Sequence, residues 1–410
     1  MKFRLTNQIS VRWIAVALGF LVLALAFSAR ATLGLLMPTW ETELGWSRSF
    51  ISGIGAMALV VMAMLAPFVG VIADRTGPRL TLSIGLVVLA IGFFTIAITS
   101  NAIVFGLAFG GLSAVAFGMV STTAVGVAIT KLFPDRLGVA IGVATSGATA
   151  GQFVIVPLIA ISISYVSWRW SIAGIALCCL LLVPITWRLL AGTDVKPTSQ
   201  KSESMQSWRD AARILPTNLT FHLLFWSFFL CGYTTTGVIE THFLPYASYC
   251  GFPPVTGAAA FGLLSAVNML GMIGAGWLAD KVNRPLLLGG IYLARGLAFL
   301  LLMNVGSDIE TLYLFSAIFG LVDYSTLPVT VSLVASHLGK RVMGLSLGLI
   351  AAGHALGGAL GAFLGGYLFD VYEQYQAVWV LSLLLTVLAG MIVFFLRDTP
   401  SATDLRLANS

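Results

Sequence analysis

Six ionisable side chains lie deep inside long apolar stretches of this sequence, and its chemistry is expected there. They are Arg30, Glu240, His242, Arg295, Asp323 and His354. An ionisable group at the centre of a lipid bilayer costs about 2.5 kcal/mol or more, so such a residue is a functional-site candidate. The basic residues could bind an organic anion, and the acids and histidines could carry a proton.

Arg295 and Asp323 are predicted to form a buried ion pair on neighbouring helices. Each lies near the middle of its apolar stretch, and a rise of 1.5 Å per residue therefore places both near the bilayer midplane. Leaving either charge alone there would be costly. The pair is either structural, with Arg295 holding Asp323 in place, or Asp323 is a site of proton uptake and release.

Arg30 and Glu240 lie at similar depths, towards the outer ends of the first and the seventh apolar stretch. Arg30 is predicted to bind a substrate anion, or to pair with Glu240 as an outer gate. The alternative is that Arg30 extends to the outer lipid headgroups while Glu240 is solvated near a helix end.

His354 lies near the midplane of the eleventh apolar stretch. Its near-neutral pKa suits it to carry a proton or to present a conditional positive charge to an anion, although a neutral packing role is the alternative. Glycines recur at every fourth position on the same stretch, at Gly353, Gly357, Gly361 and Gly365. Such a stripe lets another helix pack closely, and Gly147 and Gly151 form a shorter one in the fifth stretch.

Three further residues are candidates for binding a substrate: Tyr233, Asn268 and Gln152. Aromatic residues at helical spacing usually pack, so each is a weak signal alone. Together they predict a small pocket that is mostly apolar, with few polar groups. Such a pocket suits a small amphiphilic organic anion better than a sugar.

The elements that position these residues are predicted to be membrane-spanning helices. The 410 residues are 58% hydrophobic and 9% charged, against roughly 25% charged residues in soluble domains. A span needs about 20 largely apolar residues, and the chain has twelve such windows. They are predicted at residues 12–37, 49–73, 80–99, 102–130, 137–164, 169–190, 219–247, 255–279, 285–305, 310–335, 342–369 and 375–396.

The spans divide into two bundles of six helices. Residues 1–190 form the first, residues 219–410 form the second with a short tail, and the polar segment 191–218 is a cytoplasmic linker. Most of the 22 Lys and Arg residues fall in turns on the side of the two termini, so both termini are predicted to be cytoplasmic. The net charge of +6 thus sets topology and does not indicate nucleic-acid binding.

A short charged turn occurs twice. Residues 70–79 read Gly-Val-Ile-Ala-Asp-Arg-Thr-Gly-Pro-Arg, between the second and third spans. A weaker copy, between the eighth and ninth spans, consists of Gly276, Asp280, Lys281 and Arg284. Gly138 and Gly344 are separated by the same offset as Gly70 and Gly276, which predicts a duplicated chain. Parallel repeats of this kind place a substrate site near the midplane, where the two halves meet.

The first copy resembles the signature Gly-x-x-x-Asp-Arg-x-Gly-x-Arg of the major facilitator superfamily, and the resemblance covers the whole chain. The matching residues are Gly70, Asp74, Arg75, Gly77 and Arg79. The resemblance implies an all-α membrane protein in which twelve helices form two pseudo-symmetric bundles. It also implies that both copies of the turn act as a cytoplasmic gating latch that biases a two-state equilibrium; a static topology signal is the alternative.

Within the superfamily the sequence looks most like the branch of monocarboxylate and oxalate/formate carriers. That branch typically carries an arginine in the eighth span, often with an acid four residues earlier, where this chain has Met272 and Asn268. A basic residue in the eleventh span has its counterpart in His354.

These observations predict a secondary active transporter that moves a small, monocarboxylate-like organic anion by alternating access, coupled to protons. An efflux carrier for hydrophobic or drug-like compounds is the alternative, but Gly151 is not followed by the Gly-Pro continuation typical of drug–proton antiporters. No phosphate-binding lysine loop, metal-ligand spacing or nucleophile constellation suggests an enzyme, a cofactor or a metal. The expected partners are the lipid bilayer, the substrate and protons, and the chain is expected to be a functional monomer in the bacterial inner membrane.

Overall fold

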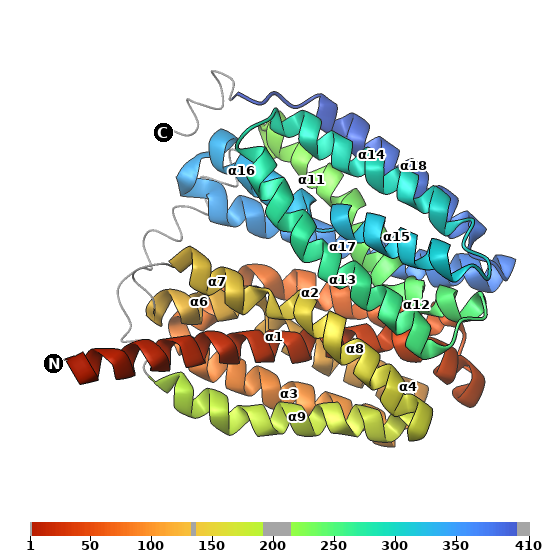
Figure 1. The fold of residues 1–410 in the computed structure, drawn as a ribbon, viewed down its shortest axis with the longest axis horizontal. Coiled ribbons are helices and arrows are strands. Elements are labelled where there is room, and N and C mark those ends of the chain that lie inside the picture. Colours follow the sequence, from red (N-terminus) through yellow and green to blue (C-terminus); the bar gives the residue numbers. More distant parts are fainter. Residues whose placement is uncertain (1, 133–136, 192–214, 400–410) are drawn as a thin grey trace. The chain divides into compact units, whose positions relative to one another are not determined.

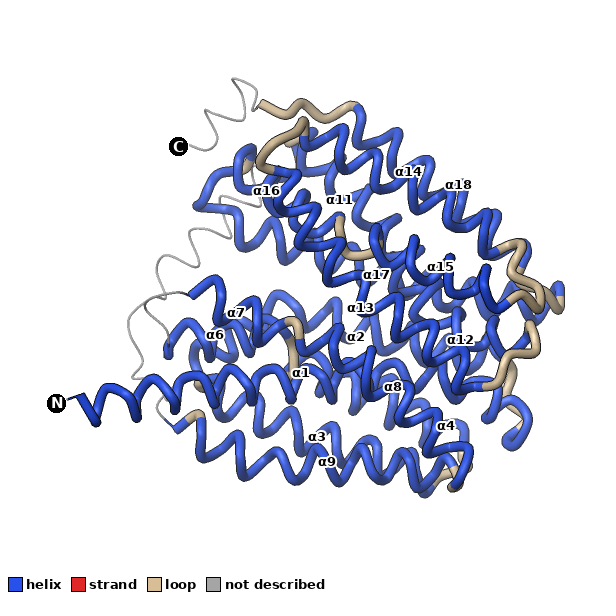
Figure 2. Tube along the Cα trace, viewed as in Figure 1, coloured by secondary structure: helices blue, strands red, loops and turns tan. Residues whose placement is uncertain are grey.

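The computed structural model describes residues 2–132, 137–191 and 215–399, and within these ranges every regular element is a helix (Figures 1 and 2). Twelve helical segments of this described part are long and apolar enough to cross a membrane. This confirms the predicted fold class and the order of the twelve spans. Most of the predicted linker at residues 191–218 lies outside the described residues.

The first compact unit comprises residues 1–45 and 57–197, and is called unit 1. Its described helices are α1 (Lys2–Leu44), most of α2 (Arg48–Thr76), α3 (Pro78–Ile98), α4 (Ala102–Gly106), the π-helix η1 (Leu107–Ser113), α5 (Ala114–Met119), α6 (Thr122–Leu132), α7 (Leu137–Thr145), α8 (Gly147–Tyr165) and α9 (Trp168–Leu189). Several of these short elements follow one another within a single span, so that α4, η1, α5 and α6 together make the fourth.

The second compact unit, unit 2, comprises residues 198–410 together with the start of α2, Trp46–Ala56. Its described helices are η3 (Leu215–Thr217), α11 (Leu219–Gly232), the π-helix η4 (Tyr233–Ile239), α12 (Glu240–Tyr249), α13 (Pro254–Ala279), α14 (Arg284–Leu302), α15 (Ile309–Val322), α16 (Thr326–His337), α17 (Gly339–Tyr372) and α18 (Gln376–Phe394). Helix α2 is therefore divided between the two units.

The first span is longer than its sequence predicts. The predicted span ends at residue 37, just before Pro38, and proline removes a backbone hydrogen bond from a helix. Helix α1 continues through Pro38 to Leu44. Trp40, on this extension, is fully buried and packs edge-on against Phe105 and Trp168, and this aromatic packing accounts for the extra turns.

The glycine stripe of α17 lies directly against the seventh span. A side chain on Gly357 would overlap the backbone of Phe229, and one on Gly361 would overlap the backbone of Tyr233. Gly365 leaves no room either, because a Cβ there would lie 2.5 Å from the His242 ring. The predicted close approach of another helix to this stripe is confirmed.

The shorter stripe in unit 1 makes the equivalent contact. A Cβ on Gly147 would overlap the backbone of Phe20, and one on Gly151 would overlap that of Ala24. Helix α8 thus packs on α1 as α17 packs on α11 and η4. The fifth span on the first and the eleventh on the seventh are corresponding pairs in a duplicated chain.

The seventh and tenth spans are interrupted at their centres. In the seventh, η4 widens the helix over Tyr233–Ile239, and such π-turns often occur at functional sites. In the tenth, α15 ends at Val322 and α16 begins only at Thr326. The span predicted over residues 310–335 is found as Ile309–His337, but it is interrupted near its centre, and Asp323 lies in the break.

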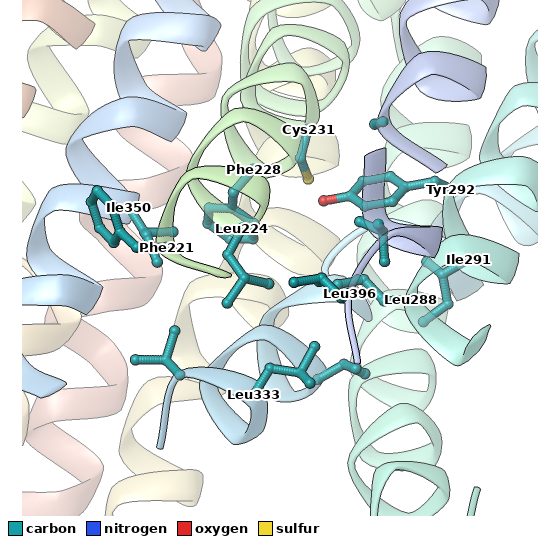
Figure 3. Packing of buried hydrophobic residues seen from close by; sticks show 14 of the residues in the cluster. Phe221, Leu224, Phe228, Cys231, Leu288, Ile291, Tyr292, Leu333, Ile350 and Leu396 are labelled. Atoms are coloured by element: carbon teal, nitrogen blue, oxygen red, sulfur yellow. The ribbon is translucent and has the colours of Figure 1, made fainter. Parts of the chain in front are cut away.

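An apolar cluster fills unit 2 beside these interruptions (Figure 3). Phe221, Leu224 and Phe228 of α11 face Leu288 and Ile291 of α14 across it. At its edge, the Cys231 sulfur and the Tyr292 hydroxyl point toward one another (Figure 3). The apolar packing thus ends at a polar region, which the candidate site occupies.

Candidate functional site

Arg295 is fully buried in α14 and binds the break in the tenth span. Its Nη2 donates to the carbonyl oxygen of Val322 at 2.9 Å and to that of Asp323. The last carbonyl groups of a helix have no partner within it, so the guanidinium caps the end of α15. Its Nη1 donates to the Cys231 sulfur at 3.0 Å and to Thr234 Oγ1 at 3.5 Å.

The Asp323 carboxylate beside this cap is buried. Its Oδ2 accepts a hydrogen bond from Asn268 Nδ2 at 3.5 Å, while its Oδ1 has no hydrogen-bond partner. Arg295 and Asp323 lie together, but the ion pair between their side chains remains a prediction. The hydrogen bonds between them run through the main chain of Asp323, and its side chain is bound by Asn268.

Asn268 of the eighth span binds the break in the tenth span through both the nitrogen and the oxygen of its side-chain amide. While Nδ2 donates to Asp323, Oδ1 accepts from the backbone N–H of Tyr324 at 3.2 Å. Asn268 is itself buried. A neutral amide therefore links the eighth span to Asp323 and to the backbone that follows it.

Glu240 reaches the same region from the first turn of α12. The Tyr324 hydroxyl donates to Glu240 Oε1 at 2.6 Å, and Glu240 lies within electrostatic range of Asp323. Glu240 is half-buried. The two acidic candidates of unit 2 are thus brought together, because Tyr324, which follows Asp323 in the chain, donates to Glu240.

His354 and Tyr233 lie on the two helices that pack along the glycine stripe. The His354 ring packs at a tilt against the Phe228 ring, with centroids 4.8 Å apart, and its side chain is half-buried. Tyr233 is buried in η4, and its hydroxyl has no hydrogen-bond partner. A buried tyrosine hydroxyl usually finds a partner, so Tyr233 departs from the usual pattern, and its role in binding a substrate remains a prediction.

Two of the substrate-binding candidates belong to unit 1. The Arg30 guanidinium lies over the Phe27 ring, 5.0 Å from its centroid, and Gln152 is buried on α8 close to the glycines of its stripe. Because Arg30 and Glu240 are in different units, their pairing remains a prediction. His242, in unit 2, is fully buried and donates from Nε2 to the Ala362 carbonyl oxygen at 2.8 Å.

The first copy of the charged turn is only partly described. Gly77 has a φ of 86°, which a residue with a side chain rarely adopts, and it begins α3. Arg79 lies over the Trp187 ring, 4.0 Å from its centroid. The side chains of Asp74 and Arg75 lie outside the described residues, as does Gly70 apart from its helical backbone. The gating role of this turn remains a prediction.

The second copy is built around Arg284. Its Nε pairs with Asp398 Oδ1 at 2.6 Å, and its Nη1 donates to Ser332 and Ser336 of α16. Lys281 instead lies over the Trp277 ring, and Asp280 is an exposed residue at the end of α13. Asp398, which follows the last span, was missed, since only its position as the first acid after that span could have suggested a role.

A second polar cluster that the sequence did not reveal lies at the start of α2. Asp370 of α17 accepts from the backbone N–H groups of Arg48 and Ser49, and Arg48 donates to the Tyr375 hydroxyl. In the sequence, Arg48 is a single basic residue between the first two predicted spans, and no local pattern connects it to Asp370. The sequence also indicated no role for Cys231, whose thiol contacts Arg295. No group of three or more His, Cys, Asp or Glu side chains in the described ranges could hold a metal ion.

The comparisons with known proteins agree with this architecture. The chain belongs to the major facilitator superfamily: the family model described as Major Facilitator Superfamily matches residues 19–344 and 275–409. It is thus a multi-pass membrane protein of a transporter family, as the resemblance of its charged turn implied.

Its relatives include several transporters. An uncharacterized MFS-type transporter, YcxA of Bacillus subtilis, is 25% identical over 84% of this chain and 85% of its own length. Monocarboxylate transporter 13 of Rattus norvegicus is 23% identical over 90% of this chain and 85% of that protein. Monocarboxylate transporter 11 of Homo sapiens is 26% identical over 67% of this chain and 57% of that protein.

Solved structures show the same fold. A bacterial homolog of the human lysosomal transporter Spinster, in an inward-facing and unoccupied conformation, has a TM-score of 0.73 with 16% identity, over 96% of this chain and 99% of that one. The nucleoside transporter NupG has a TM-score of 0.78 with 14% identity, over 94% of this chain and all of that one (100%). At these sequence identities the structural similarity shows a shared fold alone.

Proposed function

We propose that this chain is a secondary active transporter that moves a small, monocarboxylate-like organic anion together with a proton by alternating access. The observation that carries the proposal is the buried Asp323 carboxylate in the break of the tenth span, with one oxygen held by Asn268 and the other without a hydrogen-bond partner. The similarity to monocarboxylate transporters supports the class of substrate.

Asp323 is the proton carrier in this proposal. An ionised carboxylate without a full set of hydrogen bonds is costly in a low-dielectric interior, and protonation removes that cost. The break in the helix contributes as well, because it frees the chain around Asp323 from regular hydrogen bonding. In other transporters, discontinuous helices near the midplane likewise form substrate and ion sites.

In this proposal Arg295 positions Asp323 and does not bind the substrate. All of its hydrogen bonds go to groups of unit 2, including the two carbonyl oxygens that end α15. The substrate anion is instead assigned to the partly exposed basic residues Arg30 and His354. Tyr233, Gln152 and Asn268 complete the binding set, with Glu240 beside the proton site.

The rest of the transport cycle follows from the proposed topology. The two six-helix bundles, residues 1–190 and 219–410, would move against each other about the linker, with the charged turns as cytoplasmic latches. Both termini would face the cytoplasm of a bacterial cell, with the carrier acting as a monomer in the inner membrane.

Uptake into proteoliposomes tests this function. Purified carrier should accumulate labelled lactate, pyruvate or oxalate when the outside is acidic, and accumulation should disappear when a protonophore collapses the pH gradient. Empty liposomes and carrier at equal pH on both sides are the controls. Absence of uptake for all three anions would overturn the proposed substrate class, while uptake that ignores the gradient would overturn proton coupling.

A further inference from the structure

The start of α2 is bound by α17 within unit 2. The Asp370 carboxylate accepts from the backbone N–H of Arg48 at 3.2 Å and from that of Ser49 at 2.8 Å. The first N–H groups of a helix have no acceptor within that helix. A carboxylate there also interacts favourably with the helix dipole, so Asp370 caps α2 although the two lie far apart in sequence.

The Arg48 side chain makes a second, independent attachment. Its guanidinium lies 3.7 Å from the centroid of the Phe369 ring, and its Nη1 donates to the Tyr375 hydroxyl at 2.9 Å. Arg48 is buried despite its charge. Stacking on an aromatic face together with a directed hydrogen bond is the arrangement in which arginine differs most from lysine.

The backbones also approach closely at this point. A Cβ on Gly366 would overlap the Ser52 hydroxyl and would lie 2.7 Å from the carbonyl oxygen of Arg48. The start of α2 is thus fixed by a cap, a stacked cation, a hydrogen bond and a close backbone contact. These contacts explain why Trp46–Ala56 belongs to unit 2 while α2 from Met57 onward belongs to unit 1.

We propose that Arg48, Asp370 and Tyr375 form an outer latch that is made and broken in each transport cycle. The proposal rests on the alternating access of the proposed function. Helix α2 is continuous from Arg48 to Thr76, so a movement of unit 1 relative to unit 2 must either bend this helix or release its start. The contacts that hold the start are largely polar, and water can replace them when they separate.

The outer latch lies at the opposite end of α2 from the charged turn at residues 70–79. By the family resemblance that turn latches the cytoplasmic side. A single helix would then carry one latch at each end, and closure of one would accompany release of the other. The outer latch therefore stabilises the state that is closed to the outside, and weakening it shifts the population towards the outward-open state.

Labelling of a buried cysteine tests the latch without any assumption about substrate. Ser52 is fully buried beneath the latch, so a Ser52→Cys carrier with Cys178→Ser and Cys250→Ser should react slowly with a membrane-impermeant maleimide added outside. Adding Asp370→Ala or Arg48→Gln should raise that rate by about tenfold or more, because the latched state is depopulated. An unchanged rate in both variants would overturn the proposal.

The matched control is Ser47→Cys in the same backgrounds, because Ser47 is exposed. It should react fast and equally in all of them, which checks folding and orientation. Arg48→Lys keeps the charge but loses the planar stacking and should give an intermediate rate at Ser52→Cys. A Ser47→Cys rate that changes in step with that at Ser52→Cys would indicate general unfolding and would also count against a latch.

Cross-linking gives a second, independent test. In the same background, a disulfide between Ser49→Cys and Asp370→Cys should arrest transport and protect against outside labelling, and a reductant should restore both. Cross-linked carrier that still turns over at the normal rate would overturn the latch. If no tested anion is transported but the labelling rates respond, the proposed function fails while the latch stands.

Discussion

At the scale of single residues, Asp323 and Arg295 share one site but differ in how fully their polar atoms are hydrogen-bonded. Arg295 satisfies two main-chain carbonyl oxygens, a thiol and a hydroxyl. Asp323 keeps one carboxylate oxygen without a hydrogen-bond partner. Burial without full pairing is expensive and persists only when the surrounding structure or a function requires it. This contrast supports the proposed roles, in which Arg295 is a structural cap and Asp323 binds the proton.

Asp323→Asn should separate exchange from coupling. Asparagine has the same shape and can still contact Asn268, but it cannot gain or lose a proton. We expect the variant to exchange labelled for unlabelled anion while losing at least about tenfold in accumulation driven by a pH gradient. The exposed acid Glu310, changed to Gln, is the control. Normal gradient-driven accumulation by Asp323→Asn would show that another group carries the proton.

Arg295→Met should lower stability more than Arg295→Lys. Methionine fills much of the volume but leaves the carbonyl oxygens of Val322 and Asp323 without donors, at about 1–3 kcal/mol for each buried unsatisfied group. Lysine restores one charged donor group. Thermal unfolding of the detergent-solubilised protein should show the lowest Tm for the methionine variant, and a methionine variant as stable as the native protein would contradict the capping role.

At the scale of elements, glycines decide which helices meet. The stripe of α17 brings its backbone against α11 and η4, and the shorter stripe of α8 does the same against α1. In a bilayer, helix association depends on close van der Waals packing, because lipid tails are as apolar as the side chains. The seventh span carries Tyr233 and Glu240, so the stripe also fixes the depth of site residues.

Gly357→Ala and Gly348→Ala are a matched pair on α17. The new Cβ at Gly357 would overlap the Phe229 backbone, whereas nothing lies within 4 Å of a Cβ at Gly348. Alanine favours a helix over glycine by about 1 kcal/mol, so Gly348→Ala should match or exceed native stability. Gly357→Ala should lower Tm and the folded yield in size-exclusion chromatography. Equal behaviour of the two variants would show that the stripe is not a packing seam.

The Arg284–Asp398 pair should act as one unit that ties α14 to the chain after α18. The two side chains are partly exposed, 17% and 32%, so the pair alone is a modest contribution. Arg284 also binds Ser332 and Ser336 of α16, and Arg284→Ala should therefore cost more stability than Asp398→Ala. In a double-mutant cycle, the combined loss should be smaller than the sum; strict additivity would mean that the two residues act separately.

At the scale of the whole molecule, the proposed cargo sets the electrical character of the cycle. A monocarboxylate carries one negative charge, and one accompanying proton cancels it. Uptake should therefore respond to an imposed pH gradient and not to a membrane potential set by potassium and valinomycin. Adding substrate outside weakly buffered proteoliposomes should also make the external medium more alkaline. Uptake driven by a potential alone would contradict a one-to-one symport.

The sequence by itself determined the class of fold. Apolar length fixes the number of spans, because a bilayer leaves few alternatives for a long apolar segment. The repeated turn around Asp74 and Asp280 indicated the duplication, and the glycine periodicity from Gly353 to Gly365 indicated a packing seam. These signals are local or periodic along the chain, so they can be read without knowing which helices become neighbours. The intramembrane charges likewise marked where polar groups would gather.

Only the tertiary structure decided what those polar groups do. Pro328, in the first turn of α16, is a local signal that the tenth span is interrupted near Tyr324. The sequence does not show, however, that a guanidinium from α14 binds the carbonyl oxygen of Val322 and that an amide from α13 binds the N–H of Tyr324. The cap on α2 depends on Asp370, hundreds of residues later in the chain. Partners that far apart are joined by packing, and a single sequence contains no local pattern that pairs them.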